Sequence, residues 1–104
     1  MNLLPQLQAL KPALTRIRHD IHAHPELAFG EQRTSDVVAR ELASYGVEVH
    51  RGLAGTGVIG TLRNGTSNKA IGLRADMDAL PIHEANTFEH RSRHDGKMHA
   101  CGHD

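Results

Sequence analysis

The last six residues of the chain, His99-Ala100-Cys101-Gly102-His103-Asp104, carry the strongest chemical signal in the sequence. Residues two apart in an extended segment face the same side, so Cys101 and His103 can bind one metal ion, with His99 nearby. A thiolate and an imidazole together suit zinc or another borderline transition metal. Asp104 can orient an imidazole by hydrogen bonding. A buried, inert cysteine beside surface histidines fits the same spacing, and the motif alone leaves both readings open.

A pair of aspartates follows the apolar run 70–73. If this run is a strand, Asp76 and Asp78 emerge at its carboxyl end, where open α/β sheets gather their ligand sites. In an extended chain the two carboxylates point the same way. A solvated pair of acids that caps a turn explains the spacing equally well.

Two weaker patterns have structural explanations beside the functional ones. Residues 55–60 fit the G-x-G-x-x-G fingerprint of dinucleotide binding, which requires a helix directly after the glycines. Here the turn residues Asn64-Gly65 follow too soon for a helix, so we expect a tight hairpin instead. His19 and His22 lie one helical turn apart and form a second candidate metal pair, although histidines near a helix end also favour the macrodipole.

These residues must be positioned by helices followed by short strands. Apolar residues recur at steps of three and four between Leu3 and Ile21, which predicts a helix that Pro12 kinks or splits. Pro25 should end this helix near His24. A second helix is predicted over about residues 31–45. The apolar face of that helix is expected to comprise Val37, Val38, Leu42 and Tyr45, and Gly46 provides the stop.

The remainder of the chain alternates short apolar runs with turns. We predict strands at 47–49, 57–62 and 70–73, a turn at 64–65, a polar loop over 83–97 and an extended segment over 98–104. Two or three helices followed by short strands indicate an α/β fold.

Composition excludes several classes of function. The 104 residues include 12 Lys+Arg and 12 Asp+Glu, so a net charge of zero argues against nucleic acid as a partner. No apolar run is long enough to cross a membrane, and no signal peptide opens the chain. A lone cysteine cannot form an internal disulfide, which favours the reducing cytoplasm. Because the chain ends directly after its most chemically loaded motif, we expect it to be part of a longer polypeptide.

Four motifs follow one another in register over most of the chain. In chain order they are Arg18-His19-Asp20-Ile21-His22-Ala23-His24-Pro25-Glu26-Leu27, Gly55-Thr56-Gly57-Val58, Gly72-Leu73-Arg74-Ala75-Asp76-Met77-Asp78-Ala79-Leu80-Pro81 and Met98-His99-Ala100-Cys101-Gly102-His103-Asp104. Together they resemble the dinuclear metallopeptidases. The chain is similar to the amidohydrolase branch of that family, which includes hippurate hydrolases, N-acyl-amino-acid amidohydrolases and indoleacetyl-amino-acid hydrolases.

The resemblance implies that residues 1–104 are the N-terminal portion of a mixed-sheet α/β catalytic domain, without the lid and dimerisation domain. It implies two divalent metal ions (zinc, manganese, cobalt or nickel), with Cys101 and His103 among the ligands. Asp76 is the better candidate for an acid that supports those ligands, and Asp78 for a positional one. The remaining ligands, a glutamate and two histidines, and the glutamate that acts as general base are expected after Asp104.

The function implied is hydrolysis of the amide bond of N-acyl-amino acids or small peptides by a metal-activated water. The whole enzyme is expected to be a homodimer, and the 104-residue chain to be inactive by itself. The alternative is a non-catalytic relic that binds a metal weakly or pairs with a partner.

Overall fold

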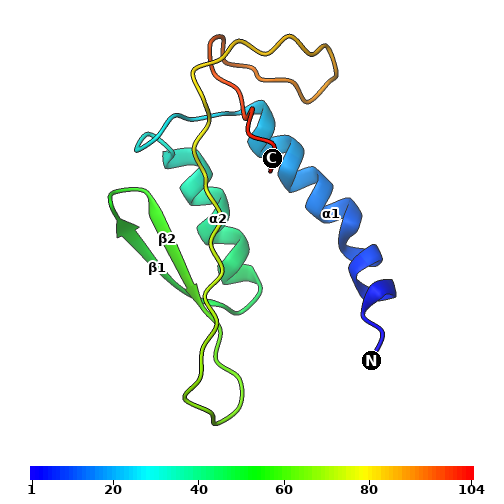
Figure 1. Cartoon of the computed structure of the whole chain (residues 1–104), viewed down its shortest axis with the longest axis vertical. Helices are drawn as coiled ribbons and strands as arrows, with labels where there is room; N and C mark the ends of the chain where they lie inside the picture. Colours follow the sequence, from blue (N-terminus) through cyan, green and yellow to red (C-terminus); the bar gives the residue numbers. More distant parts are fainter. The chain divides into compact units, whose positions relative to one another are not determined.

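The computed structural model describes all 104 residues, which form two bodies. The first body comprises residues 1–25 and 79–104, and the second comprises residues 26–78. The elements are α1 (Leu4–Ala23), α2 (Gln32–Ser44), β1 (Glu48–Leu53) and β2 (Gly57–Thr61), as Figure 1 shows. No helix has both the length and the apolar character that a membrane span requires.

Helix α1 runs without interruption through Pro12. Of the two effects predicted for this proline, the split is therefore wrong, and the kink stays a prediction. An interior proline removes one backbone hydrogen bond, and the good helix formers on either side of Pro12 keep both halves helical. The helix ends as predicted. His24 has φ −126° and ψ 61°, outside the helical region, and Pro25 follows it.

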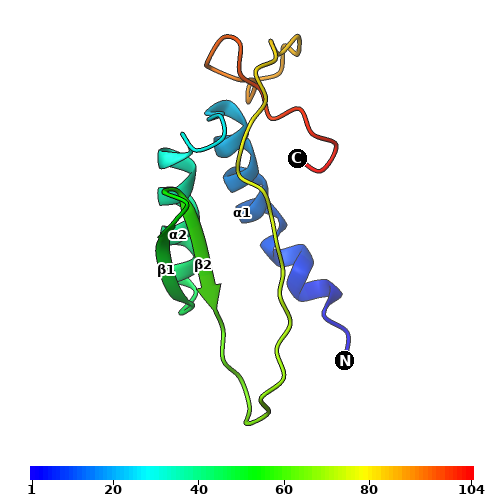
Figure 2. The same cartoon turned by 60° about the vertical axis from the view of Figure 1, so that its left-hand side comes forward.

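The segment 79–104 lies along the carboxyl-terminal half of α1, as the two views in Figures 1 and 2 agree. The backbone N–H of Arg93 donates to the carbonyl of Ala23 at 2.9 Å. Leu80 and Met98 pair through two backbone hydrogen bonds of 2.9 and 3.0 Å. The rest of this segment is the polar loop that the sequence predicts. The Leu80–Met98 pair joins the two ends of the loop, and the Arg93–Ala23 hydrogen bond joins the loop to α1.

In the second body, β1 and β2 form an antiparallel hairpin against which α2 packs. The register pairs Glu48 with Thr61 and Arg51 with Val58, and a bulge precedes the pair Leu53–Gly57. A Cβ at Gly57 would lie 2.5 Å from the carbonyl oxygen of Leu53, so only glycine fits this close approach. The G-x-G-x-x-G segment is therefore a hairpin, as predicted, and not a dinucleotide-binding loop.

Two carboxylates, one half-buried and one buried, organise the start of α2. Glu26 accepts hydrogen bonds from the backbone N–H groups of Arg33 and Thr34, at 3.0 and 2.6 Å, and from the Thr34 hydroxyl at 2.7 Å. Glu31 accepts from the backbone N–H of Phe29 and from the buried Thr56 hydroxyl, at 3.0 and 2.6 Å. Glu26 therefore caps α2 from outside the helix, and Glu31 connects the helix start to the hairpin turn.

We expect Glu26→Ala to destabilise the second body by about 2 kcal/mol, because charge-assisted caps of this kind contribute about 1–3 kcal/mol. Burial raises the pKa of Glu26, but the hydrogen bonds from Thr34 and Arg33 outweigh it and lower the pKa overall. Urea denaturation at neutral pH measures the loss. The exposed Glu48→Gln is the control, and equal midpoints for both variants would contradict the capping role.

Three predicted features differ from the structure. Tyr45 is 61% exposed instead of packed, because its hydroxyl turns outward and donates to the Glu41 carboxylate at 3.0 Å. Residues 70–73 are not a strand, since no other strand pairs with them, and Ile71 and Leu73 are exposed. The chain from Cys101 to Asp104 is a turn instead of an extended segment.

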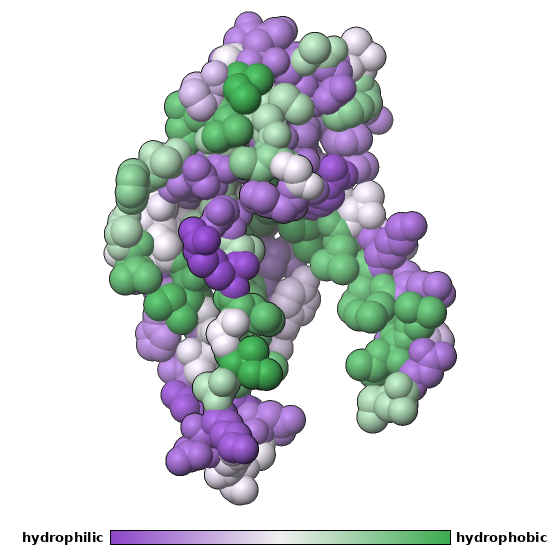
Figure 3. Space-filling model, in the orientation of Figure 1, coloured by the Kyte–Doolittle hydropathy of each residue, from purple (hydrophilic) through white to green (hydrophobic).

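The two helices and the antiparallel pair match the N-terminal part of an α/β domain, which confirms the predicted fold class. The buried side chains are small and lie mainly on α2, where Val37 and Ala39 are 5% and 7% exposed. By contrast, the leucines of the amino-terminal half of α1 remain about half exposed. Figure 3 shows hydrophobic groups along this part of the helix; they are Leu3, Leu4, Leu7, Leu10 and Leu14.

Candidate metal centre

The two predicted metal ligands lie in one tight turn of the first body. The backbone N–H of Asp104 donates to the carbonyl of Cys101 at 3.1 Å, which closes the turn around Gly102 and His103. Cys101 is a half-buried free thiol, and His103 is exposed. The spacing of Cys101 and His103 predicted that both side chains face the same side of an extended segment. The segment is a turn instead, so this part of the prediction is wrong.

The donor chemistry fits a divalent transition metal, but the number of donors does not complete a site. The thiol of Cys101 and the imidazole of His103, two residues apart, are both ligand types that zinc-like ions accept. No group of three or more His, Cys, Asp and Glu side chains in the chain is arranged to hold a metal ion. The chain therefore supplies at most two ligands at this turn, and their role as ligands stays a prediction.

Asp76, the third predicted site residue, lies in the second body. Its carboxylate accepts from the guanidinium of Arg74 at 2.8 Å, and both side chains are partly or largely exposed. Asp78 is half-buried. Both aspartates lie in a segment without helix or strand. The structure does not test their predicted role beside a metal.

A histidine clamp, which comprises His22, Glu84 and Asp104, lies next to the turn of the candidate ligands. His22 is 3% exposed in the last turn of α1. Its Nδ1 lies 2.9 Å from Oδ2 of Asp104, and its Nε2 lies 3.0 Å from Oε2 of Glu84. Each ring nitrogen therefore lies within hydrogen-bond distance of a different carboxylate, and the ring joins Asp104 to Glu84.

Glu84 is the buried anchor of the clamp, with a side chain that is 3% exposed. Besides His22, it accepts from the backbone N–H of Ser92 at 2.6 Å and from the amide of Asn86 at 2.9 Å. Burial raises the pKa of Glu84, but the hydrogen bonds from His22, Ser92 and Asn86 outweigh it and lower the pKa to about 2. Glu84 is therefore ionised at neutral pH and joins the loop 84–92 to α1.

The other histidines near the clamp stack instead of chelating. The rings of His19 and His90 lie parallel with centroids 3.6 Å apart, and Phe88 stacks on the far side of His90 at 4.0 Å. Burial lowers the pKa of His90, and the positive charges of His19, His22 and Arg18 lower it further, against the opposing effect of Glu84. The candidate pair His19–His22 is thus engaged in stacking and in the carboxylate clamp, and forms no metal group.

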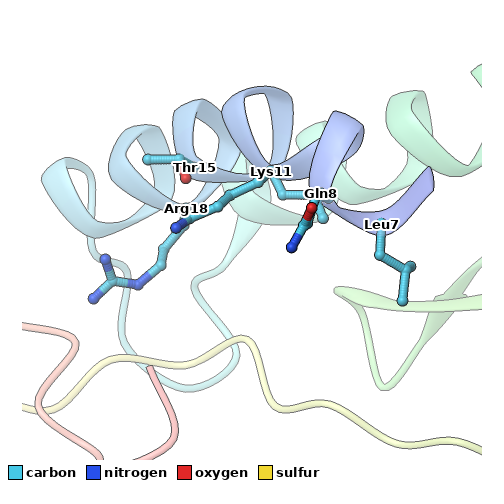
Figure 4. A pocket seen from close by; sticks show the side chains of 6 residues that line it. Leu7, Gln8, Lys11, Thr15 and Arg18 are labelled. Carbon is cyan, nitrogen blue, oxygen red and sulfur yellow. The ribbon is translucent and has the colours of Figure 1, made fainter. Parts of the chain in front are cut away.

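A shallow groove on α1 contains none of the predicted site residues. Figure 4 shows Leu7, Gln8, Lys11, Thr15 and Arg18 along one side of the helix, and Leu14 completes the lining. The groove brings apolar and cationic side chains together without an acid, a nucleophile or a metal ligand. It is a surface feature of the helix and is not the candidate site.

Sequence reasoning assigned Asp104 the task of orienting an imidazole and missed Glu84. Asp104 does orient an imidazole, but it is that of His22, 82 residues away in the chain. Glu84 lies in the polar loop, and its partner His22 is separated from it by 62 residues. No local pattern reveals such a pairing. The only sequence signal is an acid within the stretch that follows Asp76-Met77-Asp78-Ala79-Leu80-Pro81.

Comparisons with known proteins point to one family. Residues 72–104 match the model of peptidase family M20/M25/M40. Over its whole length, the chain is 48% identical to a hippurate hydrolase of Campylobacter jejuni, and it covers 27% of that protein. Over 84% of its length, the chain is also 48% identical to an N-acyl-L-amino acid amidohydrolase of Geobacillus stearothermophilus, and it covers 24% of that protein.

A solved structure shows the same likeness in three dimensions. The crystal structure of a dinuclear metal-binding peptidase of the M20 family from Bacillus subtilis matches with a TM-score of 0.85 and 40% identity, over 92% of this chain and 27% of that one. The chain thus spans about a quarter of the length of the relatives it matches. These comparisons confirm the resemblance that the four motifs indicate: the chain is similar to members of peptidase family M20/M25/M40, and its fold matches the N-terminal part of an α/β domain of such a peptidase.

Proposed function

We propose that this chain is part of a longer metal-dependent amidohydrolase that cleaves the amide bond of N-acyl-amino acids or small peptides. The observation that carries the proposal is identity of 48% to two hydrolases whose names specify N-acylated amino acids, over all or most of the chain. Since only about a quarter of each relative is matched, the full-length protein is the active species in this proposal. The 104 residues alone are expected to be inactive.

Within that protein, Cys101 and His103 are proposed to hold one or both of two divalent ions. When bound, such ions lower the pKa of a water molecule and polarise the amide carbonyl of the substrate. The thiol of Cys101 and the ring of His103 bind in their deprotonated forms, so binding releases protons and weakens at low pH. Asp76 is proposed to hydrogen-bond a ligand or the water, and Asp78 to hold the backbone of that segment.

The residues that would complete the site are not among the 104. Two ligands leave a zinc-like ion short of its usual four. The three carboxylates that the fold buries or half-buries already accept hydrogen bonds and do not suit the role of general base. Glu26, Glu31 and Glu84 are each occupied by hydrogen bonds from the fold. We propose that a glutamate and two histidines, together with the general base, come from the rest of the protein.

The finer assignments rest on the chemistry of the ligands and on composition. Thiolate and imidazole suit zinc, manganese, cobalt or nickel, and do not choose among them. We propose the cytoplasm as the compartment, because a free thiol used as a ligand requires reducing conditions. A homodimer is proposed for the full-length protein.

The test begins with the intact mass of the protein isolated from its own cells. A mass several times 11.4 kDa is expected. The purified protein is then incubated with a panel of N-acyl-amino acids, and released amino acid is quantified. We expect release that stops with a chelator and returns with added Zn²⁺, Mn²⁺, Co²⁺ or Ni²⁺. Release that survives complete metal removal would contradict the proposal, and a mass near 11.4 kDa would favour a non-catalytic relic.

A further inference from the structure

The side chains around the candidate ligand turn are held by one residue of α1. His22 is nine-tenths or more buried, and both of its ring nitrogens contact carboxylates, Asp104 at 2.9 Å and Glu84 at 3.0 Å. A histidine whose two ring nitrogens both contact a partner has a fixed ring orientation, because rotation about either side-chain bond breaks at least one of the two contacts. The clamp is therefore a rigid point of the first body.

One end of the clamp is anchored in the fold. Glu84 accepts four contacts in all, two of them from His22 and the others from Ser92 and Asn86. It is ionised at neutral pH, and the loop that it closes is tied back to the carboxyl end of α1 through Arg93. Movement of His22 would remove one partner of this buried carboxylate, which would lower the stability of the fold.

The other end of the clamp is the turn that carries the candidate ligands. Asp104 Oδ2 accepts from His22 and, at 3.2 Å, from the guanidinium of Arg18. The backbone N–H of the same residue closes the turn on the carbonyl of Cys101. Asp104 thus fixes both ends of a four-residue turn in which Cys101 and His103 lie.

We propose that His22 is a positioning residue of the metal centre: through Asp104 it sets the place and orientation of Cys101 and His103 before a metal binds. This inference rests on the proposed function, because it takes Cys101 and His103 as ligands. A side chain held by hydrogen bonds loses less freedom on binding a metal, and removal of such supporting contacts typically costs about 10–100-fold in metal affinity.

The experiment is a calorimetric titration of the metal-free full-length protein with Co²⁺, followed by the absorption of the Co²⁺–thiolate pair. We expect His22→Ala to bind Co²⁺ about 10–100-fold more weakly. The thiolate absorption should be reduced or shifted, since Cys101 is no longer held in place. His22→Gln, which can reach one carboxylate but not both, should lie between His22→Ala and the unaltered protein.

His19→Asn is the matched control, because His19 lies on the same helix and in the same histidine cluster but contacts neither Glu84 nor Asp104. It should bind Co²⁺ as the unaltered protein does. Circular dichroism reports whether each variant folds. If His22→Ala does not fold, Asp104→Asn, which weakens the same contact with little change of shape, carries the test with the same expected loss of affinity.

Cys101→Ser in the same titration distinguishes the ligand role of Cys101 from the positioning role of His22. If Cys101→Ser binds Co²⁺ normally, the ligand assignment of the proposed function fails. If Cys101→Ser weakens binding and folded His22→Ala and Asp104→Asn do not, only the positioning role of His22 is overturned. Weaker binding and an altered spectrum in all three, with His19→Asn unchanged, supports both.

Discussion

Replacing Cys101 with alanine in the full-length protein is expected to abolish metal-dependent hydrolysis while leaving the fold in place. The fold should tolerate alanine at this position, because Cys101 is only half-buried, lies in a turn and forms no disulfide. Its proposed contribution is a metal–sulfur bond. Loss of supporting contacts alone costs about 10–100-fold, so we expect loss of a ligand to reduce hydrolysis by more than about 100-fold.

The measurement is the rate of amino-acid release at saturating metal, together with metal content per protein. His50→Asn is the control, because His50 is an exposed histidine of β1 whose only partner is the neighbouring Glu48. Undiminished activity of a well-folded Cys101→Ala protein would refute the assignment of Cys101 as a ligand. Loss of activity accompanied by loss of the folded state in circular dichroism would assign Cys101 a structural role instead.

The second large effect is expected at Glu84. Glu84→Ala removes the partner of the His22 Nε2 and the acceptor of the Ser92 N–H, and leaves the buried His22 ring with one partner fewer. Leaving a buried hydrogen-bonding group without its partner typically costs about 1–3 kcal/mol. We expect a decrease of this size in the free energy of unfolding, measured by urea denaturation at pH 7, and a much smaller one for the exposed Glu48→Ala.

The pH dependence follows from the lowered pKa of Glu84. Burial opposes ionisation, but the hydrogen bonds from His22, Ser92 and Asn86 bring the pKa from 4.5 down to about 2 in the folded protein. A group whose pKa is lower in the folded state stabilises the fold above its unfolded pKa. The contribution of Glu84 is therefore full above about pH 4.5 and is lost as the pH falls toward 2.

Glu84→Gln removes this titration with little change of shape. Its stability should consequently fall less steeply than that of the unaltered protein between pH 4.5 and 2. Denaturation curves at four or five pH values in this window make the comparison. Parallel profiles for the two proteins would show that Glu84 is not held as an ionised acceptor.

The sequence predicted most of the local structure because the signals are local. The apolar spacing of the first helix, the stop at Gly46 with φ +77°, and the Gly55–Gly57 turn each depend on neighbours within a few residues. The exception, Pro12, shows that a single lost hydrogen bond does not end a helix with good helix formers on both sides.

What could not be predicted depends on partners far away in the chain. Residues 70–73 have the composition of a strand, but a strand forms only where another strand supplies its hydrogen bonds. Glu26 is a shorter-range case, since it caps α2 only because the chain turns back and brings the N–H groups of Arg33 and Thr34, seven and eight residues later, to its carboxylate. The His22–Glu84 pair is a longer-range case.

The candidate site, like the fold, could be predicted only in part. Residue type and spacing indicated Cys101 and His103 as metal ligands, but assumed an extended segment, and the structure has a turn closed by Asp104. Two motifs of the family resemblance acquire structural explanations instead of catalytic ones. Glu26 caps α2, and Thr56 binds Glu31 at the hairpin turn.

The most direct test of the account is anomalous diffraction from crystals of the full-length protein grown with Zn²⁺, at wavelengths on either side of the zinc absorption edge. The account predicts two neighbouring metal peaks, with Cys101 Sγ about 2.3 Å and a ring nitrogen of His103 about 2.1 Å from a metal. Metal peaks that are held entirely by other side chains, with Cys101 and His103 turned away, would contradict it.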